Sequence, residues 1–217
     1  MTAFKAGIRD KCGMKTKHKY MLVLALCAAG SFPGSVDKAV ADTIAFSPTS
    51  LSLISGEPAG NDGLFFTPTV GIAVTELGYV NCGFSVGHAV GLFDVTTSIL
   101  LASTTITAAS TLSSNFRYNL ITPVNLTAGH QYAIVGVYTP GTGPDQGYQA
   151  VSAGANSLIT YQGYKYNTSS TLSLPTTTYA SPIFGPNFQF VPVPEPMTTG
   201  FFFLGLGVLV CYQRTRV

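Results

Sequence analysis

Gln131-Tyr-Ala-Ile-Val-Gly-Val-Tyr138 is the stretch of the sequence that indicates the fold most directly. Successive side chains of a β-strand point to opposite faces of a sheet. Tyr132 and Ile134 would therefore share one face, and Ala133 and Val135 would share the other. This period of two predicts a β-strand.

Short runs of the same kind recur along the chain. In residues 116–121, Phe116, Tyr118 and Leu120 are expected on one face of a strand, opposite Arg117. The expected strands are residues 64–67, 70–80, 89–95, 99–106, 116–121, 131–138, 158–161 and 187–191. The expected breaks, rich in Gly, Ser and Pro, are residues 56–63, 81–87, 108–114, 128–129 and 140–147. Strands this dense predict one all-β domain over residues 42–191, an antiparallel, jelly-roll-like β-sandwich.

The N-terminal region has the three parts of a secretory signal peptide. An apolar run, residues 20–29, is followed by a polar spacer and then by Ala39-Val-Ala41. Basic residues come before the apolar run: Lys11, Lys15, Lys17 and Lys19. We expect residues 1–41 to form a signal peptide with a short helix that is cleaved after Ala41, and translation starts at either Met1 or Met14.

The C-terminal region, residues 192–217, predicts a short membrane anchor. Val193-Pro194-Glu195-Pro196 precedes an uncharged run, residues 201–211, which would span roughly 16 Å as a helix. A bilayer core is about 30 Å thick, so the anchor is short. Arg214 and Arg216 would stay on the cytoplasmic side. A buried terminal helix is disfavoured because the run has no polar face. The expected anchor residues are Phe201, Phe202, Phe203, Leu204, Leu206, Val208, Leu209 and Val210.

The order of Val-Pro-Glu-Pro, a short apolar helix and terminal arginines resembles the PEP-CTERM sorting signal of Gram-negative bacteria. The resemblance covers about the last two dozen residues. It implies export through the inner membrane, transient anchoring and processing by an exosortase-type membrane protease. It also implies a place at the cell surface or in the extracellular matrix, with exopolysaccharide or biofilm.

A second resemblance concerns the exported domain. The ordered segments 74–80, 87–94, 100–103, 116–118 and 123–129, followed by Tyr132, resemble a β-sandwich domain of unassigned function that recurs in bacterial extracellular proteins. The resemblance implies a jelly-roll-like fold. It supplies no catalytic residues.

Charge and cysteine content exclude several classes of function. Between Asp42 and Val193 the only basic residues are Arg117 and Lys165, which argues against binding to nucleic acid. Cys82 is the single cysteine of this domain, so no disulfide can close within it and no cysteine-ligated metal site can form. We expect neither a metal nor a cofactor.

His88 and Asp94 are the residues that would suggest hydrolysis, because they lie on one face of one expected strand. No Gly-x-Ser-x-Gly elbow accompanies them. The simpler interpretation makes His88 a strand-end residue bonded to backbone and Asp94 an acceptor in a turn. Acidic residues such as Glu57 and Glu76 lack the spacing signature of a glycosidase pair. The expectation is therefore a non-enzymatic protein, with a secreted hydrolase as the remote alternative.

Two loop regions are candidates for ligand contact. Tyr161, Tyr164 and Tyr166 place aromatic rings beside amide and amine donors, and Asp145 lies in a Gly/Pro-rich loop. Aromatic faces of this kind suit sugars, provided that the three rings share an exposed concave face. An ordinary hairpin is the simpler interpretation. The favoured function is a structural or adhesive surface protein, and the alternative is a carbohydrate-binding module.

Overall fold

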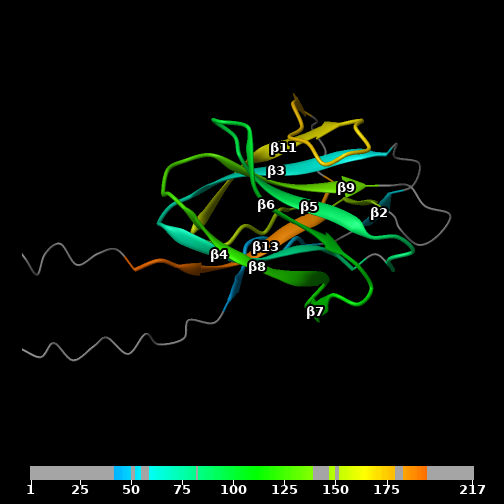
Figure 1. Cartoon of the computed structure of the whole chain (residues 1–217), viewed down its shortest axis with the longest axis horizontal. Helices are drawn as coiled ribbons and strands as arrows, with labels where there is room; N and C mark the ends of the chain where they lie inside the picture. The colour runs from blue at the N-terminus through cyan, green and yellow to red at the C-terminus, as the bar shows by residue number, and fades with distance from the viewer. Residues whose placement is uncertain are drawn as a thin grey trace, which may run out of the picture. The chain divides into compact units, whose positions relative to one another are not determined.

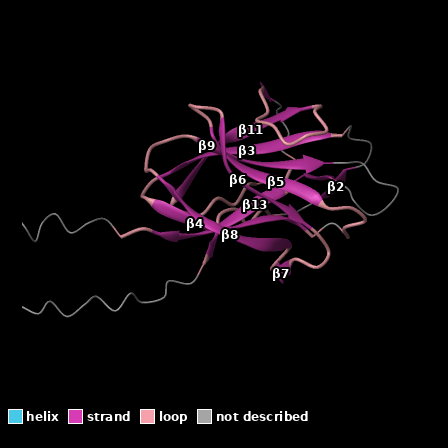
Figure 2. Cartoon of the chain, viewed as in Figure 1, coloured by secondary structure: helices cyan, strands magenta, loops and turns pink. Residues whose placement is uncertain are grey.

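The computed structural model describes residues 42–49, 52–54, 59–81, 83–138, 147–149, 152–178 and 183–194. These residues form strands and loops without a helix (Figure 2). The strands are β1 (Thr43–Ile44), β2 (Ser52–Ile54), β3 (Gly60–Pro68), β4 (Ile72–Val80), β5 (His88–Asp94), β6 (Ile99–Ile106), β7 (Thr111–Ser113), β8 (Phe116–Leu126), β9 (Tyr132–Tyr138), β10 (Gly147–Gln149), β11 (Ile159–Asn167), β12 (Thr177–Thr178) and β13 (Pro186–Pro192).

Two antiparallel sheets contain most of these strands. One has the order β1-β13-β4-β8-β7 and the other the order β12-β11-β3-β9-β5-β6, and β10 and β2 form a separate pair. Figure 1 shows β3, β9 and β5 in one layer and β4, β8 and β13 in the other. The prediction of an all-β antiparallel fold is confirmed. The expected signal and anchor helices lie outside the described residues.

A cluster of aromatic rings joins the two sheets. Phe66 on β3 lies 4.8 Å from Phe188 on β13, measured between ring centroids, and Phe46 meets both rings edge-on. All three side chains are fully buried. Because Phe66 and Phe188 come from different sheets, one core lies between the layers, an arrangement consistent with a β-sandwich.

Each expected strand corresponds to an observed one, and residues 99–106 coincide with β6. Two expected breaks were placed wrongly. Residues 60–63 belong to β3, and residues 111–113 form β7 at the edge of a sheet. In β3, polar Asn61 and Asp62 are buried, because side chains and backbone of later segments satisfy them. The sequence around them gave no sign of these distant partners.

The expected face of β8 is only partly buried. Phe116 and Tyr118 are buried, but the Leu120 side chain is 77% exposed. The short strand β7 pairs with β8 only as far as Tyr118. In addition, the β4–β8 register shifts between Val74 and Glu76, next to the partner of Leu120. Alternation therefore predicted the direction of these side chains, but it did not predict that burial of this face of β8 ends between Tyr118 and Leu120.

A second, smaller cluster lies on the other side of the β3–β9–β5 layer. It consists of Phe65, Phe93, Ala133 and Val135, which alternate with core residues along their strands. Leu172 and Leu174 pack against this cluster from the loop that follows β11. Both faces of β9 are therefore buried, as its apolar residues in both phases require.

Candidate functional site

The three tyrosines expected to contact a ligand do share a face of β11, but it faces the core. Tyr161 pairs with Phe66 and Tyr164 with Leu64, both fully buried. A register shift at Gly163, whose φ is +121°, brings Tyr161 into phase with Tyr164 and Tyr166. Glycine accepts this conformation readily. The exposed concave face required for sugar binding is therefore not formed.

The burial of these rings is unequal. Tyr164 is 3% exposed, whereas Tyr161 and Tyr166 are partly buried and pack against the core. Tyr161 meets Phe46 edge-on at 6.2 Å between centroids, and burial raises its pKa to about 12. Asp145 lies outside the described residues. The described geometry makes the tyrosine cluster a part of the core.

Tyr164 donates its hydroxyl hydrogen bond to Oδ1 of Asp62, and both residues are buried. A buried carboxylate that loses a donor costs about 1–3 kcal/mol. We expect Tyr164→Phe to lower the free energy of unfolding by that amount, measured by urea denaturation at neutral pH. Tyr161→Phe is the matched control, because no described residue bonds to its hydroxyl, and its effect should stay within about 0.5 kcal/mol. Equal effects of the two substitutions would contradict the assigned bond.

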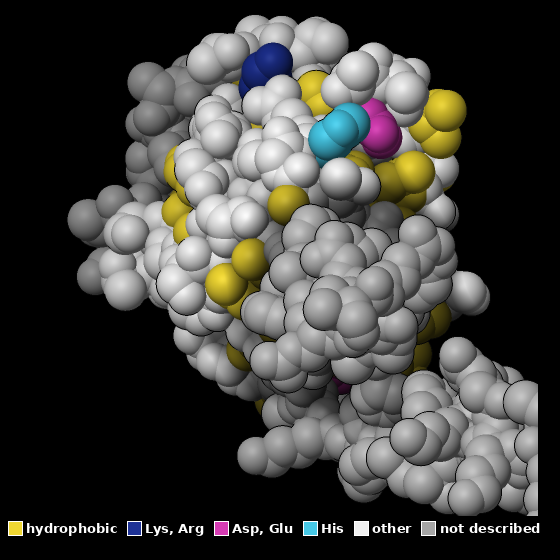
Figure 3. Space-filling view, turned by 90° about the vertical axis from the view of Figure 1, so that its left-hand side faces the viewer, with side chains coloured by type: hydrophobic (Ala, Val, Ile, Leu, Met, Phe, Trp, Pro, Cys, Tyr) yellow, Lys and Arg dark blue, Asp and Glu magenta, His cyan; other side chains and the backbone are white. Residues whose placement is uncertain are grey.

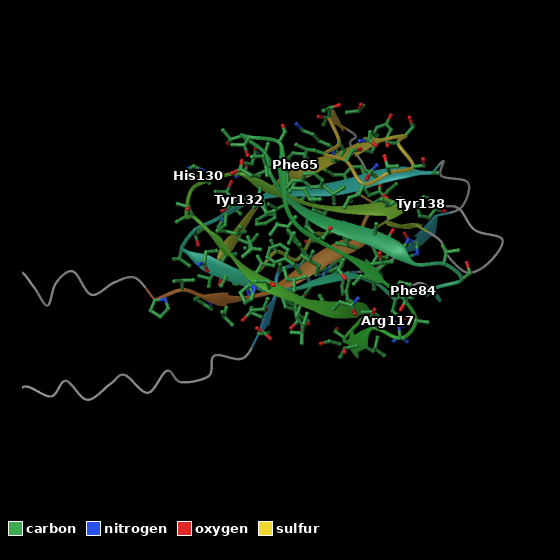
Figure 4. All side chains as sticks on the ribbon, in the orientation of Figure 1. Phe65, Phe84, Arg117, His130, Tyr132 and Tyr138 are labelled. Carbon is green, nitrogen blue, oxygen red and sulfur yellow. The ribbon has the colours of Figure 1, made fainter. Side chains whose placement is uncertain are left out.

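His88 and Asp94 lie at opposite ends of β5. Nδ1 of His88 lies 3.0 Å from the carbonyl oxygen of Val137, while Asp94 pairs with Tyr132. Figure 4 shows Tyr132 and Tyr138 at opposite ends of β9, the strand beside β5. Six residues of strand span about 20 Å. The pair therefore cannot act on one bond of a substrate.

The surroundings of these two residues match the simpler interpretation of each. His88 is 1% exposed and stacks on the ring of Tyr79 at 4.2 Å. Asp94 accepts hydrogen bonds from the backbone amides of Thr96 and Thr97 at 2.8 and 3.0 Å. The Thr97 amide above all, and further the Thr96 amide and His130, lower the pKa of Asp94. Asp94 is thus an ionised acceptor that holds a turn.

Sequence reasoning missed a stack of rings that involves Arg117. Phe84 contacts the His88 ring edge-on at 5.4 Å, and the guanidinium carbon of Arg117 lies 6.0 Å from the Phe84 ring (Figure 4). Arg117 also donates to Oδ1 of Asn81 and to the carbonyl oxygen of Ser110. Each of these groups serves the packing of the domain, so the stack offers no reactive group.

Phe84 adopts a backbone φ of +44°, which is rare for an aromatic residue. It lies in an expected break, residues 81–87, where no alternation of apolar and polar residues indicates a buried ring. The ring is only 9% exposed because it inserts between His88 and Arg117. The cost of this conformation is therefore offset by packing, and no ligand needs to be invoked.

Glu76 on β4 carries a charge in an unfavourable place. Burial, and then the charge of Asp42, raise its pKa above the ordinary value of 4.5. The hydroxyl of Tyr118 is buried, and it has no hydrogen-bond partner among the described residues. Burial, and then the charge of Glu76, raise the pKa of Tyr118 as well. The charge of Glu76 therefore acts on Tyr118 although no hydrogen bond between the two side chains is formed.

The raised pKa of Glu76 predicts a specific pH dependence. Because the folded state holds this proton more tightly than the unfolded state, stability falls as pH rises from 4.5 through the folded pKa. We expect Glu76→Gln to reduce that fall, measured as the free energy of unfolding from pH 4 to 7. Asp94→Asn should act oppositely, since the lowered pKa of Asp94 contributes stability above its ordinary value of 3.8. Parallel pH profiles of Glu76→Gln and the unmodified chain would contradict the assignment.

No three His, Cys, Asp or Glu side chains come together as a metal site within the described residues. That same part of the chain contains no helix of the length and apolarity needed to cross a membrane. The expected anchor, residues 201–211, and the cleavage residues Ala39 and Ala41 lie outside it. No protein-family model matches the chain, and a comparison with curated proteins found no match.

Proposed function

We propose that the chain is an exported protein of the PEP-CTERM type, with a structural or adhesive role at the cell surface or in the extracellular matrix. The observation that carries the proposal is that the β domain fills the sequence between the expected signal peptide, residues 1–41, and the expected sorting segment, residues 192–217. β1 begins at Thr43, two residues after Ala41, and β13 ends at Pro192, next to the Pro-Glu-Pro motif. The amide of Val193 still donates to the carbonyl oxygen of Gly71 at 2.9 Å.

For the fold itself, we propose a jelly-roll-like β-sandwich. The chain passes from β3 in one sheet to β4 in the other, and back to β5. It crosses again between β6 and β7 and between β8 and β9. Such repeated crossings between two antiparallel sheets, together with the shared core, support a Greek-key sandwich.

A non-enzymatic role is supported by the contacts of the polar side chains, which bond to groups of the domain itself. His88 and Arg117 bond to backbone groups, and Asp94 holds a turn. Lys165 lies 4.7 Å above the ring of Phe65, so both basic residues of the domain contact rings. In Figure 3 charged and histidine side chains form small spots among uncharged ones. Such a surface suits an uncharged polar matrix such as exopolysaccharide better than a nucleic acid.

The sorting step can be tested with the full chain in a Gram-negative host that contains an exosortase-type protease. The unmodified chain should yield a shorter mature form that begins at Asp42 and has lost the C-terminal tail, as determined by mass spectrometry. Combined Pro194→Ala, Glu195→Ala and Pro196→Ala substitutions should leave the uncleaved form in the membrane fraction. Gln213→Ala is the control and should be processed normally. Normal processing of the triple variant would refute the assigned signal.

The matrix role needs a separate measurement. The mature form released by this host should co-sediment with the host's exopolysaccharide in a saturable manner, and it should stay in solution without the polysaccharide. A processed and folded product that stays in solution with the polysaccharide would leave the sorting proposal standing and refute the proposed association.

A further inference from the structure

The first and the last strand of the domain meet at one end of the same sheet. β1 pairs antiparallel with β13, with Thr43 opposite Phe190, so the start of β1 and the end of β13 lie at the same end. Pro192 pairs with Ile72, and Ile72 pairs with Leu126, which places the end of β13 beside the start of β4 and the end of β8. We call this end of the domain the exit end.

Loops from both sheets lie at the exit end. The amide of Gly129 donates to the carbonyl oxygen of Pro68 at 2.9 Å, and the amide of Val193 donates to that of Gly71 at the same distance. Figure 4 shows His130 on the side of the domain where β13 ends. The loops of the exit end are residues 69–71, 95–98 and 127–131.

Charge is sparse at the exit end. Its three loops contain no Asp, Glu, Lys or Arg, and their one titratable side chain is that of His130. The nearby carboxylates are already bonded: Asp42 accepts from a hydroxyl of β4 at 2.9 Å, and Asp94 accepts from backbone amides of its own turn. Ile99 and Val193 are 56% and 39% exposed. Such an end can approach lipid headgroups without taking an unpaired charge out of water.

A short spacer separates the exit end from the expected anchor. Residues 194–200 lie between Val193, which is still hydrogen-bonded to the domain, and Phe201, the first residue of the expected anchor. These seven residues reach at most about 25 Å when fully extended. The eleven residues of β8 alone span about 35 Å along the domain. The spacer is thus shorter than the domain, and it keeps the exit end within reach of the bilayer.

We infer that the exit end faces the membrane while the tail is attached, with its loops against the lipid headgroups, and that the short spacer holds it there. This inference rests on the proposed function, because it requires the C-terminal segment to be a membrane anchor. The pairing of β1 with β13 brings the chain next to Ala41 and the chain next to Pro194 to this one end. Both expected processing sites therefore lie on the side of the domain where a membrane protease works, and the opposite end points toward the matrix.

The test uses the absence of tryptophan from the sequence, since a single introduced tryptophan then reports one position. Ala128→Trp places it in an exit-end loop, and Asn115→Trp places it at the opposite end of β8; both residues are exposed. The chain with its tail, from a host without an exosortase-type protease, is reconstituted into phosphatidylcholine vesicles that contain lipids with a nitroxide on the headgroup. Ala128→Trp should lose fluorescence to this quencher, whereas Asn115→Trp should keep it.

Flotation of the same vesicles separates the two ways in which the inference could fail. A chain that does not float with the vesicles would refute the anchor, and the inference with it. A chain that floats but is quenched equally at both positions would leave the anchor standing and overturn the inference alone. Thr69→Trp, at an exposed residue of a second exit-end loop, gives an independent reading if Ala128→Trp does not fold.

The length of the spacer gives a second test. Insertion of about ten Gly and Ser residues between Gly200 and Phe201 makes the tether longer and flexible. The quenching of Ala128→Trp should then fall, while the chain should still float with the vesicles. Unchanged quenching would mean that the spacer does not hold the exit end at the headgroups, and it would overturn the inference.

Discussion

Replacing Phe66 with alanine is expected to lower the free energy of unfolding by about 3–5 kcal/mol. The side chain is fully buried, and its ring meets those of Phe46, Tyr132 and Phe188 at centroid distances between 4.8 and 6.2 Å. Phe66 and Phe188 belong to different sheets. Removal of the ring therefore leaves a cavity between the layers, and neither rigid sheet can move to fill it.

The measurement is urea unfolding of the full chain, followed by circular dichroism in the presence of a mild detergent. Leu120→Ala is the matched control, since it also shortens an apolar strand residue but at a site that is 77% exposed. Its effect should remain within about 0.5 kcal/mol. If the two substitutions cost the same, the core does not lie between the sheets as described.

Much of the strand pattern could be predicted, because it depends on local periodicity. The run from Gln131 to Tyr138 has apolar side chains in both phases, and every residue of β9 is buried. The eight residues of β6 were delimited correctly by the turn residues on both sides. Alternation also predicted which face of β8 carries Leu120. It did not predict that this side chain is exposed, because the neighbouring strand β7 ends beside Tyr118.

The sequence could not show whether the tyrosines of β11 face solvent or the core, because their direction depends on one bulge and on hydrogen bonds to distant residues. Without the register shift at Gly163, Tyr161 would lie on the face opposite Tyr164. The sequence of residues 161–166, Tyr-Gln-Gly-Tyr-Lys-Tyr, does not by itself indicate that register shift. The hydroxyl of Tyr164 is bonded to Asp62, 102 residues earlier. The pairing of buried polar groups across such separations is decided by topology, which one sequence does not show.

The same limit explains the early start of β3. Asn61 and Asp62 look like turn residues, and the sequence predicted a break there. In the structure Asn61 is fully buried, and its amide bonds to the segment after β11, more than 100 residues later. A polar residue in a strand is stable when its partners are supplied by another part of the chain.

Asn61→Ala is expected to release the loop after β11 and to lower the free energy of unfolding by about 2–4 kcal/mol. Nδ2 of Asn61 lies 2.9 Å from Oδ1 of Asn167 and from the carbonyl oxygens of Ser169 and Thr171. Oδ1 of Asn61 accepts from the amide of Ser173 at 3.0 Å. The Asn61 side chain therefore bonds both carbonyl oxygens and an amide of the loop after β11. Between residues 168 and 173 this loop contains no strand that could satisfy them.

Loss of the Asn61 side chain should also have a local effect on hydrogen exchange, in addition to its effect on the free energy of unfolding. The loop carries Leu172 and Leu174, which cover Phe65. Hydrogen exchange at the amide of Ser173 should therefore accelerate in Asn61→Ala more than exchange in β4 of the other sheet. Asn125→Ala, at an exposed asparagine of β8, is the matched control and should change neither rate.

A second substitution separates the loss of hydrogen bonds from the loss of volume. Asn61→Asp keeps the size of the side chain and the acceptor for Ser173, but it turns an oxygen toward the carbonyl oxygens of Ser169 and Thr171. The new carboxylate oxygen is repelled by these two carbonyl oxygens, so the cost of the substitution should equal or exceed that of alanine. If Asn61→Asp retained the stability of the unmodified chain, the amide donors of Asn61 would not be what holds the loop.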